Sequence, residues 1–112
     1  MTLRLHVQEP YFSFIKSGSK KVEGRQKDSE LCALKPGALV IFFHEELGEV
    51  SVKVKAVRAY PSLNAFLEGE GVPVLLPDCT TLEEGRAVYF RFYTEESIQK
   101  AGGMLAIEIE VQ

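Results

Sequence analysis

The sequence predicts an α+β domain in which strands are interspersed with short helices. Two segments, residues 50–57 and 104–111, alternate apolar and polar side chains as half-buried strands do. A third segment, residues 81–93, opens with the capping box Thr81-Leu82-Glu83-Glu84 and continues with aromatic residues at helical spacing. The length of 112 residues suits a single domain that spans residues 1–112.

Shorter patterns predict the other elements. Pro10 suits the first position of a helix, because its missing N–H would have no partner there. Gly69 is expected to stop a short helix that begins near Leu63. In chain order we expect a strand at 3–7, a helix at 10–16, an extended segment at 21–25, a loop at 26–35, a strand at 38–43, a helix at 63–69 and a loop at 71–77.

The two alternating strands carry opposite charges on their polar faces. Lys53 and Lys55 lie on the first strand, and Glu108 and Glu110 lie on the second. Opposite charges across a strand ladder contribute ~0.2–1 kcal/mol per pair. We therefore expect the two strands to be neighbours, with one of these lysines near one of these glutamates.

Composition argues against several classes of protein. No apolar run approaches the ~20 residues that span a bilayer, and residues 1–4 lack the layout of a signal peptide. We therefore expect a cytoplasmic protein that makes no membrane contact. Cys32 and Cys79 are far apart and form no C-x-x-C pair, so we expect reduced thiols, no metal and no cofactor.

The charge is unevenly distributed along the chain. The net charge of −3 argues against indiscriminate binding of nucleic acid. Residues 1–60 hold ten basic and seven acidic side chains, whereas residues 61–112 hold three and nine. The first half is thus positive and the second negative, which is compatible either with a local positive binding surface or with an ordinary solvated face.

The most informative stretch has the pattern G-x-K-x-x-E-x-R and directly follows the helix expected at 10–16. Gly18 just past that helix supplies a left-handed cap, so the chain is expected to turn there. Extended geometry then places Glu23 and Arg25 on one face. Lys20, at the bend, reaches the same face through its long stem. The full motif is Gly18-Ser19-Lys20-Lys21-Val22-Glu23-Gly24-Arg25.

This motif resembles the signature of the ASCH family. Gln8-Glu9-Pro10-Tyr11 before it adds to the resemblance, and Lys35-Pro36-Gly37, Val52-Lys53-Val54 and residues 89–93 look most like a small branch of uncharacterised archaeal and bacterial members. The resemblance implies a small PUA-like β-barrel of mixed, mainly antiparallel strands with short helices at the rim. It also implies that the motif lines a cleft.

The charged residues of the motif allow two interpretations. An exposed ion-pair cluster would add little to stability. In a partly closed cleft, Lys20 would lose its proton more readily, Glu23 would accept hydrogen bonds or position water, and Arg25 would bind phosphate or hold Glu23. The resemblance favours the cleft, with Gln8 or Tyr11 on its opposite wall, where Gln8 would read a base edge or an amide and Tyr11 would stack on a ring.

Two consequences follow for variants and for the aromatic residues. We expect Lys20→Ala to abolish ligand binding with little loss of stability. Tyr89, Phe92 and Tyr93 have helical spacing, which usually indicates a core, so we expect at most one of them to face a ligand.

An enzymatic function is the first alternative. Some family members that resemble this chain remove the acetyl group of N4-acetylcytidine, using a lysine base, a threonine nucleophile and a later acidic residue. Lys20 matches the lysine, and Asp78 falls near the acid by loose alignment. Glu23 occupies the nucleophile position, where it could activate water but could not provide a hydroxyl. The catalytic residues of such an amidohydrolase would be Lys20, Glu23 and Asp78.

The leading hypothesis is a binding domain whose cleft, lined by Gln8, Tyr11, Lys20, Glu23 and Arg25, recognises RNA or a modified nucleoside. A protein-interaction adaptor is the second alternative, although no segment of the sequence marks a surface for it. We expect a monomer.

Overall fold

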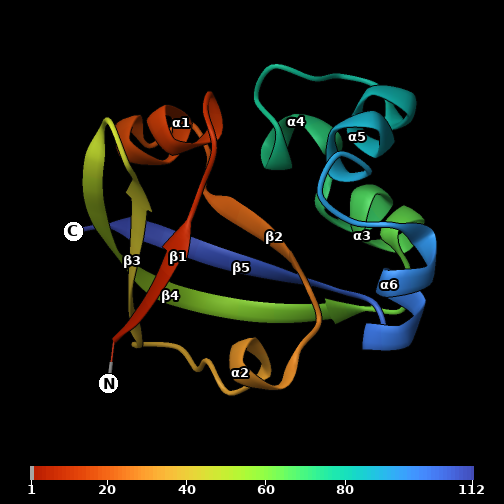
Figure 1. Cartoon of the computed structure of the whole chain (residues 1–112), viewed down its shortest axis with the longest axis horizontal. Coiled ribbons are helices and arrows are strands. Elements are labelled where there is room, and N and C mark those ends of the chain that lie inside the picture. Colours follow the sequence, from red (N-terminus) through yellow and green to blue (C-terminus); the bar gives the residue numbers. More distant parts are fainter. Residues whose placement is uncertain (1) are drawn as a thin grey trace.

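The computed structural model describes residues 2–112 of the chain (Figure 1). The strands are β1 (Leu3–His6), β2 (Val22–Gln26), β3 (Leu39–His44), β4 (Gly48–Tyr60) and β5 (Met104–Val111). The helices are α1 (Tyr11–Ser17), α2 (Ser29–Cys32), α3 (Leu63–Glu70), α4 (Val72–Leu75), α5 (Leu82–Tyr89) and α6 (Glu95–Ala101). Among the described residues, no helix is both long and apolar enough to cross a membrane.

The strands form one curled sheet, a half-barrel, in the order β1-β3-β4-β5-β2. The pair β1 and β3 is parallel and the other pairs are antiparallel. β1 and β2 are therefore the two edges of the sheet. Helices α3–α6 gather at one side of the sheet, while α1 and α2 lie at opposite ends of it (Figure 1). The predicted α+β class, with a curled and mainly antiparallel sheet and short helices, is confirmed.

The predicted pairing of the two alternating strands is also confirmed. β4 and β5 are antiparallel neighbours, and Lys53 lies opposite Glu110 in their register. Lys55 Nζ lies 3.8 Å from Glu110 Oε2. The apolar faces of both strands are buried in the core, with Val52 and Val54 on β4 packed beside Ile107 and Ile109 on β5.

Three short helices, α2, α4 and α6, differ from the elements that the sequence predicted, which were two loops and one longer helix. α2 lies in the loop expected at 26–35, because the side chain of Asp28 accepts a hydrogen bond from Leu31 N (3.0 Å). α4 lies in the loop expected at 71–77. The helix expected at 81–93 ends at Tyr89, and after a turn Thr94 begins α6 with a capping box closed by Ser97 rather than by Glu or Gln.

Gly69 does not end its helix, so that expectation is wrong. α3 continues to Glu70, and Gly71 with φ 92° ends it. A Cβ at Gly69 would lie 2.5 Å from Tyr60 Cε1. Glycine is therefore needed there because it lets the Tyr60 ring pack against α3.

A buried carboxylate connects α3 to the sheet. Arg58 on β4 donates from Nε and Nη2 to the two oxygens of Glu70, at 2.7 and 2.8 Å, and from Nη1 to Glu108 Oε1 at 2.9 Å. Tyr60 also donates to Glu70. The side chain of Glu70 is only 6% exposed, and its hydrogen bonds from Arg58 lower its pKa.

Arg58→Met should destabilise the protein by about 3 kcal/mol at neutral pH, because it leaves a buried carboxylate without its cation. The pKa of Glu70 is lower in the folded protein than in the unfolded chain. The ionised carboxylate therefore stabilises the fold at pH values above its unfolded-state pKa, and this stabilisation is lost as the pH falls through its folded-state pKa. The difference between variant and wild type, measured by urea unfolding, should therefore shrink in acid.

Lys55→Met is the matched control, because Lys55 lies on the same strand and its contact with Glu110 is exposed. It should change the free energy of unfolding by no more than about 1 kcal/mol. Equal losses in the two variants would contradict a special role for the buried carboxylate.

Candidate functional site

A pocket of about 130 Å³ lies between the two edge strands and the helices beside them. β1, α1 and β2 supply one part of its wall, and the other part comes from the end of α4, from α5 and from the turn after α5. The lining residues are His6, Val7, Gln8, Tyr11, Lys20, Glu23, Gly24, Arg25, Leu76, Val88, Tyr89, Phe92 and Tyr93. The five ligand-binding residues predicted from the sequence all lie in this set.

The local fold delivers the motif as the pattern predicted. Gly18 has φ 85° and its N–H bonds the carbonyl of Ile15, which closes α1 in a left-handed cap. The N–H of Lys20 then bonds Phe14 O at 2.9 Å, which holds the bend before β2. Within β2, Glu23 and Arg25 both line the pocket.

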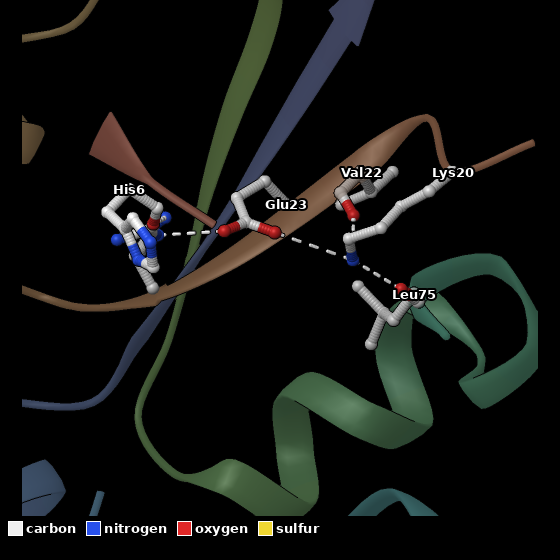
Figure 2. A network of polar contacts seen from close by, with 6 residues as sticks. His6, Lys20, Val22, Glu23 and Leu75 are labelled. Carbon is white, nitrogen blue, oxygen red and sulfur yellow. Dashed lines mark hydrogen bonds and ion pairs between the residues drawn. The ribbon is translucent and has the colours of Figure 1, made fainter. Parts of the chain in front are cut away.

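Lys20 is buried, and acceptors surround its ammonium group. Nζ donates to Val22 O at 2.8 Å and to Leu75 O, and lies 3.5 Å from Glu23 Oε1 (Figure 2). Nζ also lies 5.9 Å from the centre of the Tyr11 ring. Burial lowers the pKa of Lys20, and the nearby Glu23 carboxylate opposes this effect. Its contacts join the start of β2 to the end of α4.

Arg25 connects the two edges of the half-barrel. Its Nε donates to Glu23 Oε2 at 2.8 Å, and its Nη2 donates to the backbone carbonyl of His6 on β1 at 2.7 Å. Burial disfavours its charge, but the Glu23 carboxylate together with Tyr93 and Tyr89 more than offsets burial and raises the pKa of Arg25. Glu23 therefore lies between two cations, one beside each of its oxygens.

Gly24 has a structural role that the sequence pattern did not reveal. A Cβ at this position would lie 2.4 Å from Phe66 Cζ and 2.7 Å from the Tyr89 hydroxyl oxygen. Glycine therefore lets both aromatic rings approach β2. The close approach brings the Tyr89 hydroxyl to the wall of the pocket beside Glu23 and Arg25.

Aromatic residues form much of the wall. Tyr89, Phe92 and Tyr93 all line the pocket, together with Tyr11 from α1. Helical spacing indicated that at most one of the first three would face a ligand, whereas all three line the pocket, because α5 ends at Tyr89 and the following turn brings Phe92 and Tyr93 to the same side. Burial raises the pKa of Tyr89 strongly and that of Tyr93 as well, so both are neutral donors at physiological pH.

Asp78 is exposed and is not among the residues that line the pocket. Its charge opposes the lowering of the Lys20 pKa, so it lies near the site without forming its wall. The neighbouring Cys79 is buried, and burial raises the pKa of its thiol. Within residues 2–112 there is no cluster of side chains suited to a metal ion.

Other residues of the site gave no signal in the sequence. His6 lies on β1, Leu76 directly after α4 and Val88 on α5, and only the tertiary structure brings them to one pocket. His6 is the most informative of them, because its carbonyl accepts from Arg25 while its ring Nε2 lies 2.6 Å from Glu45 Oε2 on the outer side.

The comparisons agree with this fold and motif. The model of the ASCH domain matches residues 5–112, nearly the whole chain. The chain belongs to the ASCH domain family. No curated protein matches it.

Two solved structures resemble this ASCH domain along its whole length. The crystal structure of the hypothetical protein PH0355 has a TM-score of 0.89 and 44% identity, with 100% of each chain covered. The solution NMR structure of protein PF0455 from Pyrococcus furiosus has a TM-score of 0.79 and 42% identity, with 99% of this chain and 97% of that chain covered.

The contacts of Lys20 revise the stability expected for its variants. Lys20→Met should destabilise the ASCH domain by about 3 kcal/mol, because Glu23 loses a buried cation and two backbone carbonyls lose a donor. Urea unfolding measures the effect. Lys21→Met is the control, since Lys21 is exposed and should change stability by no more than about 0.5 kcal/mol. A stable Lys20→Met variant would restore the original expectation.

Proposed function

We propose that the pocket of this ASCH domain binds a nucleobase, presented either by RNA or by a modified nucleoside. The observation that carries the proposal is a buried carboxylate, Glu23, held between Lys20 and Arg25 in a pocket with aromatic walls. Aromatic side chains stack on bases, and a fixed polar group reads their edges.

The size of the pocket favours a single planar group. Its volume of about 130 Å³ is below the ~300–1,000 Å³ typical of sites for drug-sized ligands. One ring fits such a space better than a complete nucleotide does. The sugar and phosphate would then remain outside, where exposed basic residues such as Lys16 and Lys21 lie on the segments that deliver the motif.

The proposal predicts different effects at two similar residues. Phe90 and Phe92 are both 41% exposed and two positions apart, but only Phe92 lines the pocket. Because base–aromatic stacking contributes ~1–3 kcal/mol per base, Phe92→Ala should weaken binding of a short single-stranded RNA by about tenfold or more. Phe90→Ala should leave it nearly unchanged.

Fluorescence anisotropy with a labelled oligoribonucleotide at low salt measures this difference. Affinity should also fall as salt is added, because Lys16 and Lys21 would release counterions from the RNA backbone. Equal effects of the two phenylalanine variants would exclude the pocket as the binding site. Undetectable binding at low salt would exclude RNA and leave free nucleosides as the ligand class.

Hydrolysis of an acylated nucleoside is the second candidate, and the burial of Lys20 favours it. Burial lowers the pKa of this lysine, as a general base requires. The three acceptors around its ammonium group favour a binding function instead. Each of them stabilises the protonated amine, which cannot act as a base. Asp78 is exposed and does not line the pocket, so it is not positioned to act as the acid of such a hydrolase.

Incubation with N4-acetylcytidine, followed by chromatography for cytidine and acetate, separates the two candidates. A hydrolase would release both products in equal amounts, and Lys20→Met would abolish the release whereas Lys21→Met would not. Binding without release of cytidine is the outcome expected here, and it would exclude the amidohydrolase for this substrate.

A further inference from the structure

The Glu23 carboxylate has unused capacity to accept hydrogen bonds. An ionised carboxylate has about four lone-pair positions on its two oxygens. Lys20 lies beside Oε1 (Figure 2). Arg25 donates to Oε2, so one interaction is made at each oxygen. Because Glu23 also lines the pocket, the remaining lone pairs present two adjacent acceptors to a ligand.

Arg25 holds this carboxylate from one side. Its Nε donates to Glu23 and its Nη2, on the same side of the guanidinium, donates to the His6 carbonyl. Nη1 lies on the other side of the guanidinium, away from Glu23, so the carboxylate alone supplies the free groups at this point of the pocket.

The free acceptors define the ligand edge that fits them. Arg25 lies on the Oε2 side of Glu23 and Lys20 lies on the Oε1 side, so the two cations flank the carboxylate. A complementary ligand edge must present two adjacent donors, one to each oxygen.

Among the four RNA bases in their neutral forms, guanine has this edge. Its O6 is an acceptor, and N1–H and the N2 amino group are adjacent donors. Uracil has one N–H between two carbonyl oxygens, whereas cytosine and adenine place a ring-nitrogen acceptor beside their amino group. With each of these three bases at least one Glu23 oxygen would face another acceptor, and the two acceptors repel each other while the desolvated lone pair gains no partner.

We infer that Glu23 makes the pocket specific for the Watson–Crick edge of guanine. N1–H and the N2 amino group donate to the two oxygens of Glu23, one to each. This inference rests on the proposed function, since it names which base the pocket holds. Lys20 does not contact the base; it positions Glu23 through the ion pair at 3.5 Å.

A nucleoside panel tests the inference on the wild-type protein. Guanosine, inosine, 1-methylguanosine, adenosine, cytidine and uridine are titrated into 15N-labelled protein, and the amide shifts of the pocket residues give the affinities. Guanosine should bind most tightly. Inosine, which lacks only the N2 amino group, should bind about tenfold more weakly, because a hydrogen bond to a charged group is lost. Blocking N1 in 1-methylguanosine should abolish binding.

The outcomes distinguish a failure of the proposed nucleobase binding from a failure of the guanine inference alone. If none of the six nucleosides shifts the pocket resonances, and RNA does not bind either, the proposed function fails. If nucleosides bind but inosine equals guanosine, or uridine or cytidine equals it, the pocket binds bases and the guanine inference is overturned.

Glu23→Gln provides a second readout, because it replaces one acceptor by a donor. It should weaken guanosine binding at least tenfold and remove the preference over inosine. Glu49→Gln is the control, since Glu49 pairs with Arg4 at an exposed position and is not in the pocket, and it should bind guanosine as wild type does. If Glu23→Gln is folded by circular dichroism and retains the guanosine preference, the inference is wrong. If it does not fold, the comparison of guanosine with inosine on the wild-type protein decides the question.

Discussion

The ammonium group of Lys20 lies where three parts of the structure meet. It donates to a carbonyl in β2 and to the last carbonyl of α4, and it pairs with the carboxylate of Glu23. This contact links the helical side of the molecule to the strand that carries the motif. Arg25 then extends the same network from Glu23 to the carbonyl of His6, so that a chain of polar contacts runs from α4 through β2 to β1.

This network has a consequence for the sheet. A half-barrel has two edge strands with unpaired backbone groups, and here they are β1 and β2. Arg25 crosses between them with a side chain rather than with a ladder of backbone hydrogen bonds. The gap that remains between the edges is the pocket, and Gly24 lets Tyr89, which lines the pocket, come close to β2. The same opening in the sheet thus creates both the cavity and the polar groups within it.

A buried group of two cations and one carboxylate is expensive to desolvate, and apolar residues of similar size often give equal or greater stability. The cluster around Arg58 and Glu70 illustrates a structural alternative, because its carboxylate receives two hydrogen bonds from one arginine and a third from Tyr60. Glu23 instead retains unused hydrogen-bonding capacity and lines a cavity. That difference is the physical reason for interpreting one cluster as structural and the other as a binding site.

The sequence by itself determined the local features of this protein. Alternation along β4 and β5, with lysines on one and glutamates on the other, predicted their pairing. The glycine after α1 and the extended geometry of β2 predicted that Lys20, Glu23 and Arg25 would converge, and the family resemblance added a cleft with Gln8 or Tyr11 on its opposite wall. These features depend on residues close in sequence or on a simple period. The sequence did not determine the ends of short helices, which depend on individual caps such as Asp28 and Thr94. Only the tertiary structure decided that Leu75 O would accept from Lys20, that His6 O would accept from Arg25, and that Phe92 and Tyr93 would line the pocket. Each of these contacts joins elements far apart in the chain, and no local pattern encodes the packing of one element against another.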